Sequence, residues 1–240
     1  MAPQLRMTRE ELISYLLHTQ IPTLLVEGDG DEALFRRLEQ SLDSSGIGVM
    51  SVGGKGSLHA IYMRRAEMAG KRIAFLRDRD EYVAAAVPQD WGDYILTVGY
   101  SIENDILHKP VLEALAGESV GRLRILIGLM SDWFRAALSA YLRGEGPLLS
   151  RDVSAIVDDD AYTAIALAEL AWPLEVECSA LDSSDSWVWM RGKTLLRVLQ
   201  FFFSGTSQLY SKEQLVDISM RLGPSENFLV LTDAVRARLG

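Results

Sequence analysis

The sequence predicts an α/β fold in its first half, with a mostly parallel four-stranded sheet flanked by helices, and a helical second half. Three observations support this prediction. Short runs of β-branched and apolar residues alternate with amphipathic segments up to about residue 107, glycines separate many of them, and helical patterns alone follow from about residue 110. Strands and helices that alternate at this pace imply βαβ crossovers, which join parallel strands.

The first half contains four candidate strands and the helices that connect them. The strands are expected at residues 23–26 (TLLV), 47–52 (IGVMSV), 73–76 (IAFL) and 94–98 (YILTV). Residues 31–42 have apolar side chains at helical spacing. Ser57 is a candidate N-cap of a helix that runs to about Met68, with Gly70 placed to end it. Ser101 is a candidate N-cap for a helix after the fourth strand.

The second half is expected to be a helical bundle that packs on or beside the sheet. Helical patterns occur at residues 111–115, 123–142, 161–171, 194–203 and 229–239. Tryptophan and phenylalanine side chains at residues 187, 189 and 201–203 suit a helical core or an interface better than base stacking. We therefore expect two domains, an α/β domain over residues 1–110 and a helical extension over residues 111–240.

The composition limits the class of protein. The 24 basic and 33 acidic residues give a net charge of −9, which argues against a protein that coats nucleic acid. The argument is weaker against a nuclease, because metal-binding carboxylates add to the acidic count. Cys178 is the single cysteine, so an intramolecular disulfide and a cysteine-rich zinc site are excluded. No signal peptide and no run of roughly 18 apolar residues is visible, which predicts a cytoplasmic protein without a membrane span.

Acidic residues follow three of the predicted strands. Glu27 ends the first strand, Asp78 and Asp80 of the RDRD segment follow the third, and Glu103 follows the fourth. Ligands of open parallel sheets bind outside the carboxyl ends of the strands. In an extended segment Asp78 and Asp80 would point the same way, and a divalent cation would relieve their repulsion. The alternatives are a solvated acid pair for the DxD segment and a helix-dipole contact for Glu103.

The turn after the first strand contains further acids. Gly28 and Gly30 permit a tight strand-to-helix turn, and Asp31 follows Glu27 by four residues. This spacing can bring Asp31 toward the same sheet edge as Glu27, although Asp31 could also cap the helix. Asp29 is interpreted as a helix cap.

Five segments together resemble a known family. VEGDGDEALF, VGGKGSL, FLRDRDEY, GYSIEND and RGKTLL are similar to motifs of the TOPRIM domain, which occurs in topoisomerases, bacterial primases and OLD-family nucleases. They resemble more closely the TOPRIM family with a helical extension that acts in anti-phage defence, the AriB effectors of the PARIS system. The first four motifs cover about residues 23–107.

The resemblance implies a site for two Mg²⁺ or Mn²⁺ ions. Its ligands would be the acids of these motifs: Glu27, Asp31, Asp78, Asp80 and Glu103. Glu27 would also act as general acid or base. Lys193 of RGKTLL matches a lysine that faces the scissile phosphate, although a solvated lysine near a helix start is the alternative.

The VGGKGSLH segment resembles a phosphate-binding P-loop only superficially. Val49 and Gly56 stand where that pattern requires Gly and Ser or Thr. Lys55 is therefore kept as a candidate contact to a nucleic-acid phosphate, against the alternative of a plain strand-to-helix turn.

The function implied by the resemblance is that of a Mg²⁺- or Mn²⁺-dependent endonuclease. The family would make it an anti-phage effector that cleaves RNA, with tRNA as a candidate, after release from an ABC-type ATPase partner, and that acts as a homodimer. The alternatives are a non-catalytic TOPRIM sensor or scaffold and a DNA nuclease of the OLD type. A primase or topoisomerase fragment is disfavoured because the accessory domains those reactions need are absent.

Overall fold

A computed structural model describes residues 7–28, 32–144, 149, 152–156, 186–205 and 209–240 of the chain. Packing divides the chain into two units. One consists of Met1–Arg77, Gln89–Leu96 and Val230–Gly240, and the other of Asp78–Pro88 and Thr97–Leu229. Asp29, Asp31 and the helix expected at residues 161–171 lie outside the described residues. The expected division into domains at about residue 110 stays a prediction.

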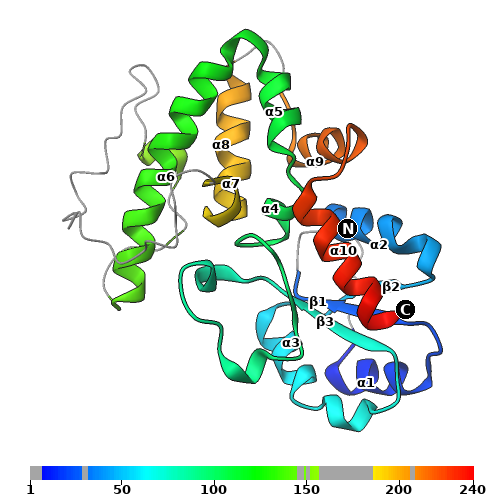
Figure 1. The fold of residues 1–240 in the computed structure, drawn as a ribbon. Coiled ribbons are helices and arrows are strands. Elements are labelled where there is room, and N and C mark those ends of the chain that lie inside the picture. The colour runs from blue at the N-terminus through cyan, green and yellow to red at the C-terminus, as the bar shows by residue number, and fades with distance from the viewer. Residues whose placement is uncertain (1–6, 29–31, 145–148, 150–151, 157–185, 206–208) are drawn as a thin grey trace. The chain divides into compact units, whose positions relative to one another are not determined.

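The first unit contains a four-stranded parallel sheet, as predicted. Its strands are β1 (Thr23–Val26), β2 (Gly48–Ser51), β3 (Ile73–Arg77) and β4 (Ile95–Leu96), in the order β2-β1-β3-β4. Figure 1 labels the first three of them. β1 is central, and all four of its residues are buried. Val26 lies opposite Ser51 on one side and Leu76 on the other. The next residues along β1 and β3 are therefore Glu27 and Arg77.

Helices flank this sheet. They are α1 (Arg9–His18), α2 (Glu32–Leu42), α3 (Lys55–Tyr62) and the C-terminal part of α10 (Glu226–Leu239). The chain goes outward from β1 to β2 and then returns past β1 to β3, so right-handed crossovers place α2 and α3 on opposite faces of the sheet. Arg236 of α10 donates to the Ser41 carbonyl of α2 at 2.8 Å. The C-terminus of the chain therefore belongs to the sheet domain.

Two helix boundaries differ from the sequence prediction. α3 begins at Lys55, with Gly54 rather than Ser57 as its N-cap, because Gly54 adopts a φ of 124° that L side chains rarely reach. The helix also ends at Tyr62, and a separate 3₁₀ turn, Arg65–Met68, occupies the rest of the predicted span. α1, which was not predicted, is stabilised by a capping box between Thr8 and Glu11.

The described part of the second unit is helical. Its helices are α4 (Ile102–Ile106), α5 (Lys109–Ala116), α6 (Val120–Leu142), α7 (Ser186–Trp189), α8 (Gly192–Ser204) and α9 (Lys212–Arg221). Short 3₁₀ turns lie at Asp80–Val83, Gly117–Ser119 and Val153–Ala155 here, and at Asp43–Ser45 and Gln89–Trp91 in the first unit. No strand occurs in the described residues after Leu96, in agreement with the prediction.

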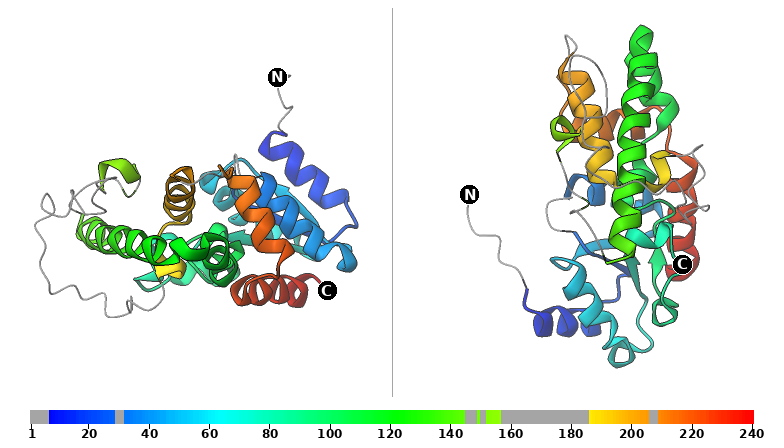
Figure 2. Two further views of the ribbon diagram at one scale, coloured as in Figure 1. Left: turned by 90° about the horizontal axis from the view of Figure 1, so that it is seen from above. Right: turned by 90° about the vertical axis from the view of Figure 1, so that its left-hand side faces the viewer.

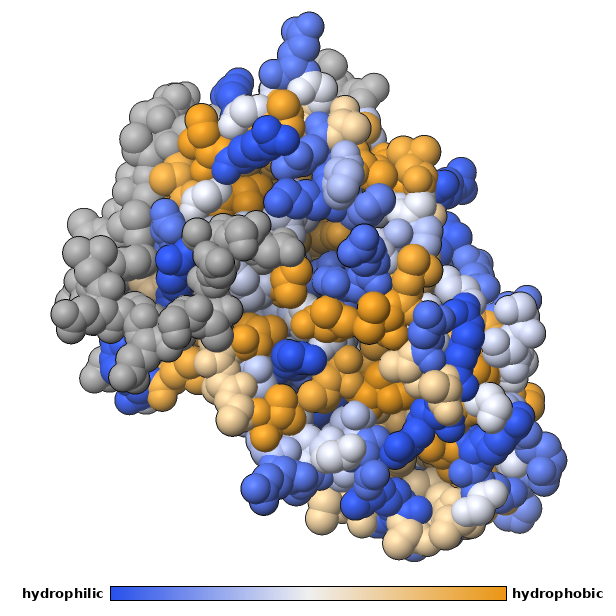
Figure 3. All heavy atoms as spheres, viewed as in Figure 1, coloured by the Kyte–Doolittle hydropathy of each residue, from blue (hydrophilic) through white to orange (hydrophobic). Residues whose placement is uncertain are grey.

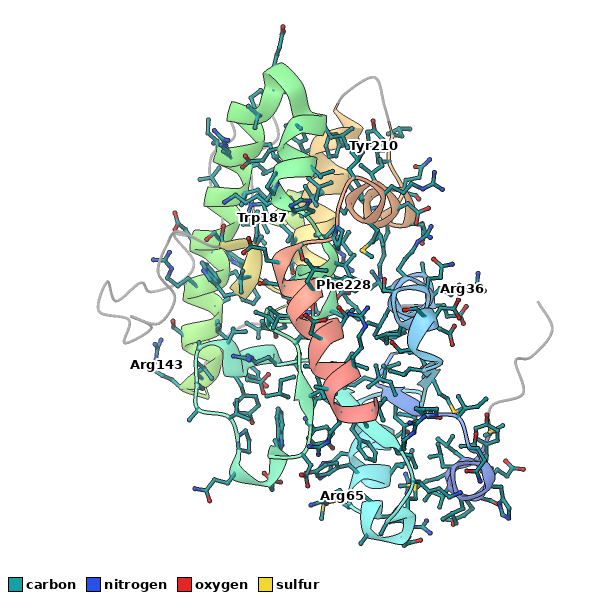
Figure 4. All side chains as sticks on the ribbon, turned by 45° about the vertical axis from the view of Figure 1, so that its right-hand side comes forward. Arg36, Arg65, Arg143, Trp187, Tyr210 and Phe228 are labelled. Carbon is teal, nitrogen blue, oxygen red and sulfur yellow. The ribbon has the colours of Figure 1, made fainter. Side chains whose placement is uncertain are left out.

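α6 and α8 form the centre of this helical unit. They run side by side in both Figure 1 and Figure 2, and their facing sides build one apolar core. Trp133 and Phe134 of α6 and Leu199 of α8 are fully buried. Trp187 of α7, labelled in Figure 4, is also buried in this core. So are Trp189, Phe202 and Phe203, while Phe201 is partly buried against it, which agrees with a core role for these aromatic residues.

The surface mixes hydrophilic and hydrophobic residues on the face drawn in Figure 3. Among the described residues, Lys109–Leu142 is long and apolar enough, by length and composition, to cross a membrane. The sequence pattern predicted that no segment would be long and apolar enough to span a membrane, so this stretch differs from that prediction. Most of its apolar window, 61%, is buried in the structure, which is also typical of a core helix, so the stretch is weak evidence for a membrane span.

Candidate metal centre

Glu27 lies beside a buried arginine at the carboxyl end of the sheet. It directly follows β1, and Arg77 is the last residue of the neighbouring strand β3. The Arg77 Nε atom is 3.8 Å from Oε1 of Glu27, and the Arg77 side chain is only 8% exposed. Both side chains are thus held together in a largely desolvated place, where their attraction is stronger than in water.

An aromatic platform holds the Arg77 guanidinium. Its central carbon lies 3.5 Å from the ring centroid of Trp91 and 5.5 Å from that of Tyr94. Burial raises the pKa of Tyr94 to about 12, while Arg77 acts in the opposite direction. Stacking of this kind on tryptophan is attractive and favours one orientation of the guanidinium plane.

In the second unit, the DxD segment is tied to the loop that precedes α4. Oδ1 of Asp78 accepts a hydrogen bond of 3.1 Å from the backbone of Ile102, the first residue of α4. The Asp80 backbone donates to the Tyr100 carbonyl at 2.7 Å. Between them, the Arg79 backbone donates to Oγ1 of buried Thr97. Asp78 therefore serves as a polar anchor at the start of α4.

Asp80 adopts an unusual backbone conformation. Its φ of 52° makes it the one non-glycine residue with positive φ in the part of the chain that the structure describes. Arg79, between the two acids, is in the helical region (φ −70°, ψ −29°), so the segment is not extended there and the alternation argument that placed Asp78 and Asp80 on one face does not apply. Left-handed residues other than glycine cost free energy and cluster at functional sites.

Glu103 is a buried carboxylate on α4, with 1% of its side chain exposed. Oε2 accepts a hydrogen bond of 2.6 Å from the Ser101 hydroxyl. Oε1 is buried and has no hydrogen-bond donor in the described structure, and Lys212 Nζ of α9 lies 4.0 Å from it. A buried carboxylate oxygen without a donor is costly. This oxygen therefore fits a role as ligand to a hard divalent cation.

The N-terminus of α8 packs directly against α4. A Cβ atom on Gly192 would lie 2.4 Å from the Ser101 hydroxyl and 2.6 Å from the Cβ of Glu103. The Asn104 side-chain amide donates to the carbonyls of Trp187 and Met190 at 2.6 and 2.7 Å. The structure thus brings the SIEN and RGK motifs together, and places the backbone of exposed Lys193 one residue from this contact.

A second acid of α4 has a structural role. Asp105 is fully buried, and its carboxylate accepts hydrogen bonds from the backbone of Val98 and Gly99 at 2.9 and 2.7 Å. Burial raises its pKa to about 6, against the effect of these two hydrogen bonds. Asp105 therefore holds the loop that leads into α4.

Sequence reasoning did not identify several of these residues. Arg77 was visible only as a member of RDRD, and Lys212 belongs to a helix that was not predicted. Gly192 and Asn104 lie inside the RGKTLL and GYSIEND motifs, which was the one signal that could have found them.

Lys55 is exposed at the start of α3. Within the described residues, no three His, Cys, Asp or Glu side chains form a group that could hold a metal ion.

Comparison with known families agrees with the fold. Residues 22–80 match the family described as "Overcoming lysogenization defect protein-like, TOPRIM domain". The matched range contains Glu27, Asp78 and Asp80, whereas Glu103 and Lys193 lie beyond it. Comparison with curated proteins yields no match. The four-stranded parallel sheet with flanking helices is a TOPRIM-like α/β fold with a helical extension, and such domains generally bind divalent metal ions and suggest a nuclease-type or primase-like function.

Proposed function

We propose that the protein is a metal-dependent TOPRIM nuclease that hydrolyses phosphodiester bonds. The observation that supports this most is the family match over residues 22–80, which contains Glu27 directly after β1 and the DxD acids directly after β3. These acids follow the carboxyl ends of adjacent parallel strands, and open parallel sheets bind their ligands at that edge. Glu103, buried and with one oxygen that lacks a donor, adds a further ligand candidate.

The proposed ligands of one or two Mg²⁺ or Mn²⁺ ions are the acids predicted from sequence: Glu27, Asp31, Asp78, Asp80 and Glu103. When bound, such ions activate a water molecule and stabilise the leaving oxygen of an in-line displacement. Glu27 is proposed to move the proton of the attacking water as general acid or base. Ser101 orients Glu103 by its hydrogen bond to Oε2. Lys193 is proposed to supply positive charge to the phosphate in the transition state.

The finer proposal concerns the substrate and the biological context. We propose an anti-phage defence effector, similar to the AriB effectors of the PARIS system, that cleaves RNA, with tRNA as a candidate substrate. An ABC-type ATPase is the proposed inhibitory partner, and a cytoplasmic homodimer is the proposed active form. The support is the resemblance of the five motifs. Because the net charge is −9, substrate phosphates must be bound by local basic residues such as Lys55.

Two alternatives keep specific support. Glu27 and Glu103 each lie near a basic side chain, Arg77 and Lys212, which would suit a non-catalytic sensor or scaffold whose acids are compensated without metal. A DNA nuclease of the OLD type is favoured by the family that matches residues 22–80. The two alternatives and the main proposal each predict a different result for a comparison of wild type with Glu27→Ala.

The test compares wild type with Glu27→Ala. Each is incubated with Mg²⁺ or Mn²⁺ and tRNA, single-stranded RNA or duplex DNA, and each is expressed inducibly with and without the ATPase partner, followed by sequencing of cleaved RNA ends. Glu113→Ala is the matched control, because Glu113 is 16% exposed and pairs with Arg124, much as Glu27 is 17% exposed and pairs with Arg77. We expect cleavage by wild type and the control only.

The outcomes separate the three candidates. Cleavage confined to duplex DNA would favour the OLD-type nuclease. Calorimetric Mg²⁺ binding that depends on Glu27, without turnover or toxicity under any condition, would favour the sensor. Identical behaviour of wild type and Glu27→Ala in binding and cleavage would refute a metal site at Glu27.

A further inference from the structure

We propose that Arg77 is a positioning residue for Glu27, that Trp91 holds Arg77 in place, and that Trp91 consequently reports on a divalent cation bound at Glu27. The inference rests on the proposed function, because it assumes that Glu27 binds the cation. All three residues belong to the sheet unit of the chain.

The burial of Arg77 requires an explanation. Arginine is almost never fully buried unless it is paired, yet Arg77 is 7% exposed. Its Nε atom donates no hydrogen bond in the described structure. The interactions that compensate its charge include the Glu27 carboxylate at 3.8 Å, the faces of Trp91 and Tyr94, and a side-chain hydrogen bond with Tyr94. A cation held by aromatic faces on one side and one carboxylate on the other suits a residue that orients that carboxylate.

The separation of the two charged groups matters. At 3.8 Å, the Nε–Oε1 distance exceeds the 2.7–3.2 Å of an N–H···O hydrogen bond. Arg77 therefore attracts Glu27 through charge, and this contact does not use the carboxylate oxygen as a hydrogen-bond acceptor. Groups that orient metal ligands from behind typically change metal affinity by about 10- to 100-fold when they are removed.

The coupling to Trp91 follows from electrostatics. A divalent cation at Glu27 would share the carboxylate with Arg77 and repel the guanidinium, which stands 3.5 Å from the Trp91 ring. Cation binding should therefore change the environment of this indole and its fluorescence. Arg65, labelled in Figure 4, provides an internal comparison. It stacks on Tyr62 at 4.2 Å but pairs with Asp93 and is 42% exposed.

The experiment measures Mg²⁺ binding to the full chain by calorimetry and by tryptophan fluorescence. Wild type should show a Mg²⁺-dependent change in emission. Trp91→Phe should lose most of that change because the reporting indole is gone, while Mg²⁺ binding should remain measurable by calorimetry, because phenylalanine preserves a face for stacking. Arg77→Met removes both the group that positions Glu27 and a charge that repels the cation, so it should change the Mg²⁺ affinity by about 10-fold or more and abolish the emission change. Arg77→Lys keeps the charge but not the planar stack, so its Mg²⁺ affinity and its emission change should lie between those of wild type and Arg77→Met.

The Arg65→Met control should match wild type in both measurements. The inference is overturned if Glu27-dependent binding is present but Arg77→Met and Arg77→Lys bind Mg²⁺ as tightly as Arg65→Met, or if the wild-type change in emission persists in Trp91→Phe. Circular dichroism checks the fold of each variant, and Arg77→Lys decides the question if Arg77→Met does not fold. Mg²⁺ binding that is absent, or equal in wild type and Glu27→Ala, instead contradicts the metal site itself and with it this inference.

Discussion

Gly192 at the start of α8 lies so close to Glu103 of α4 that a Cβ atom on Gly192 would stand 2.6 Å from the Cβ of Glu103. The contact joins a motif from the end of the chain to the buried carboxylate after the fourth strand. It also explains why glycine precedes Lys193, since any side chain at residue 192 would push α8 away from α4.

Gly192→Ala should therefore destabilise the protein. The new methyl group would meet Ser101, Glu103 and Asn104 within 2.8 Å, and overpacking of this kind costs about 1–3 kcal/mol. Urea unfolding measures the loss. Gly121→Ala in α6 is the control, because its Cβ would meet nothing within 4 Å, and alanine in a helix should add stability. Equal stability changes in the two variants would contradict the close contact.

Asp80 should carry a backbone cost that glycine relieves. Asp80→Gly and Asp80→Ala both remove the carboxylate, but only glycine accepts a φ of 52° without a steric penalty. We expect the glycine variant to exceed the alanine variant by about 1–2 kcal/mol in the free energy of unfolding. Both should lose nuclease activity equally if the carboxylate is a metal ligand. Equal stability of the two variants would show that the left-handed conformation is absent in solution.

Lys212 and Lys193 should have different roles. Lys212→Met removes the cation 4.0 Å from buried Glu103 and should cost about 1–3 kcal/mol of stability, which added Mg²⁺ should partly restore by supplying a new positive charge. Lys193→Met should leave stability nearly unchanged, because Lys193 is exposed, while it lowers cleavage. Thermal unfolding with and without Mg²⁺, together with cleavage rates, tests both. Equal Mg²⁺ stabilisation of Lys212→Met and wild type would contradict the first role.

The Glu113–Arg124 pair should make stability depend on acidic pH. The Arg124 hydrogen bond lowers the pKa of Glu113 from its ordinary value of 4.5, so the folded state favours the ionised form. The stabilisation is present above that value and is lost as the pH falls through the lowered pKa of the folded state. Arg124 is 63% exposed, so solvent limits the effect to about 0.3–1 kcal/mol. The stability gap between wild type and Glu113→Gln at pH 7 should narrow as the pH falls below 4.5 and through the lowered pKa of Glu113, and a constant gap would refute this linkage.

Local patterns were sufficient to predict the sheet and its acids. Four strands appear within a few residues of the predicted bounds, and Ser101 caps α4 as expected. Strand periodicity and the acids directly after Val26 and Arg77 are properties of short segments, so a single sequence reveals them. The boundary of α3 was predicted less well, because the conformation of Gly54 rather than the nearby serine sets where that helix begins.

The partners of the acids come from distant parts of the chain. Arg77 reaches Glu27 because β1 and β3 are neighbours in the sheet, and Lys212 reaches Glu103 because α9 packs against α4. Periodicity indicates which face of a helix is buried, but it does not say which element covers that face. The left-handed residue Asp80 likewise has a distant partner, since its backbone donates to the Tyr100 carbonyl. Long-range packing, rather than local propensity, therefore determines how the charge of each buried acid is compensated.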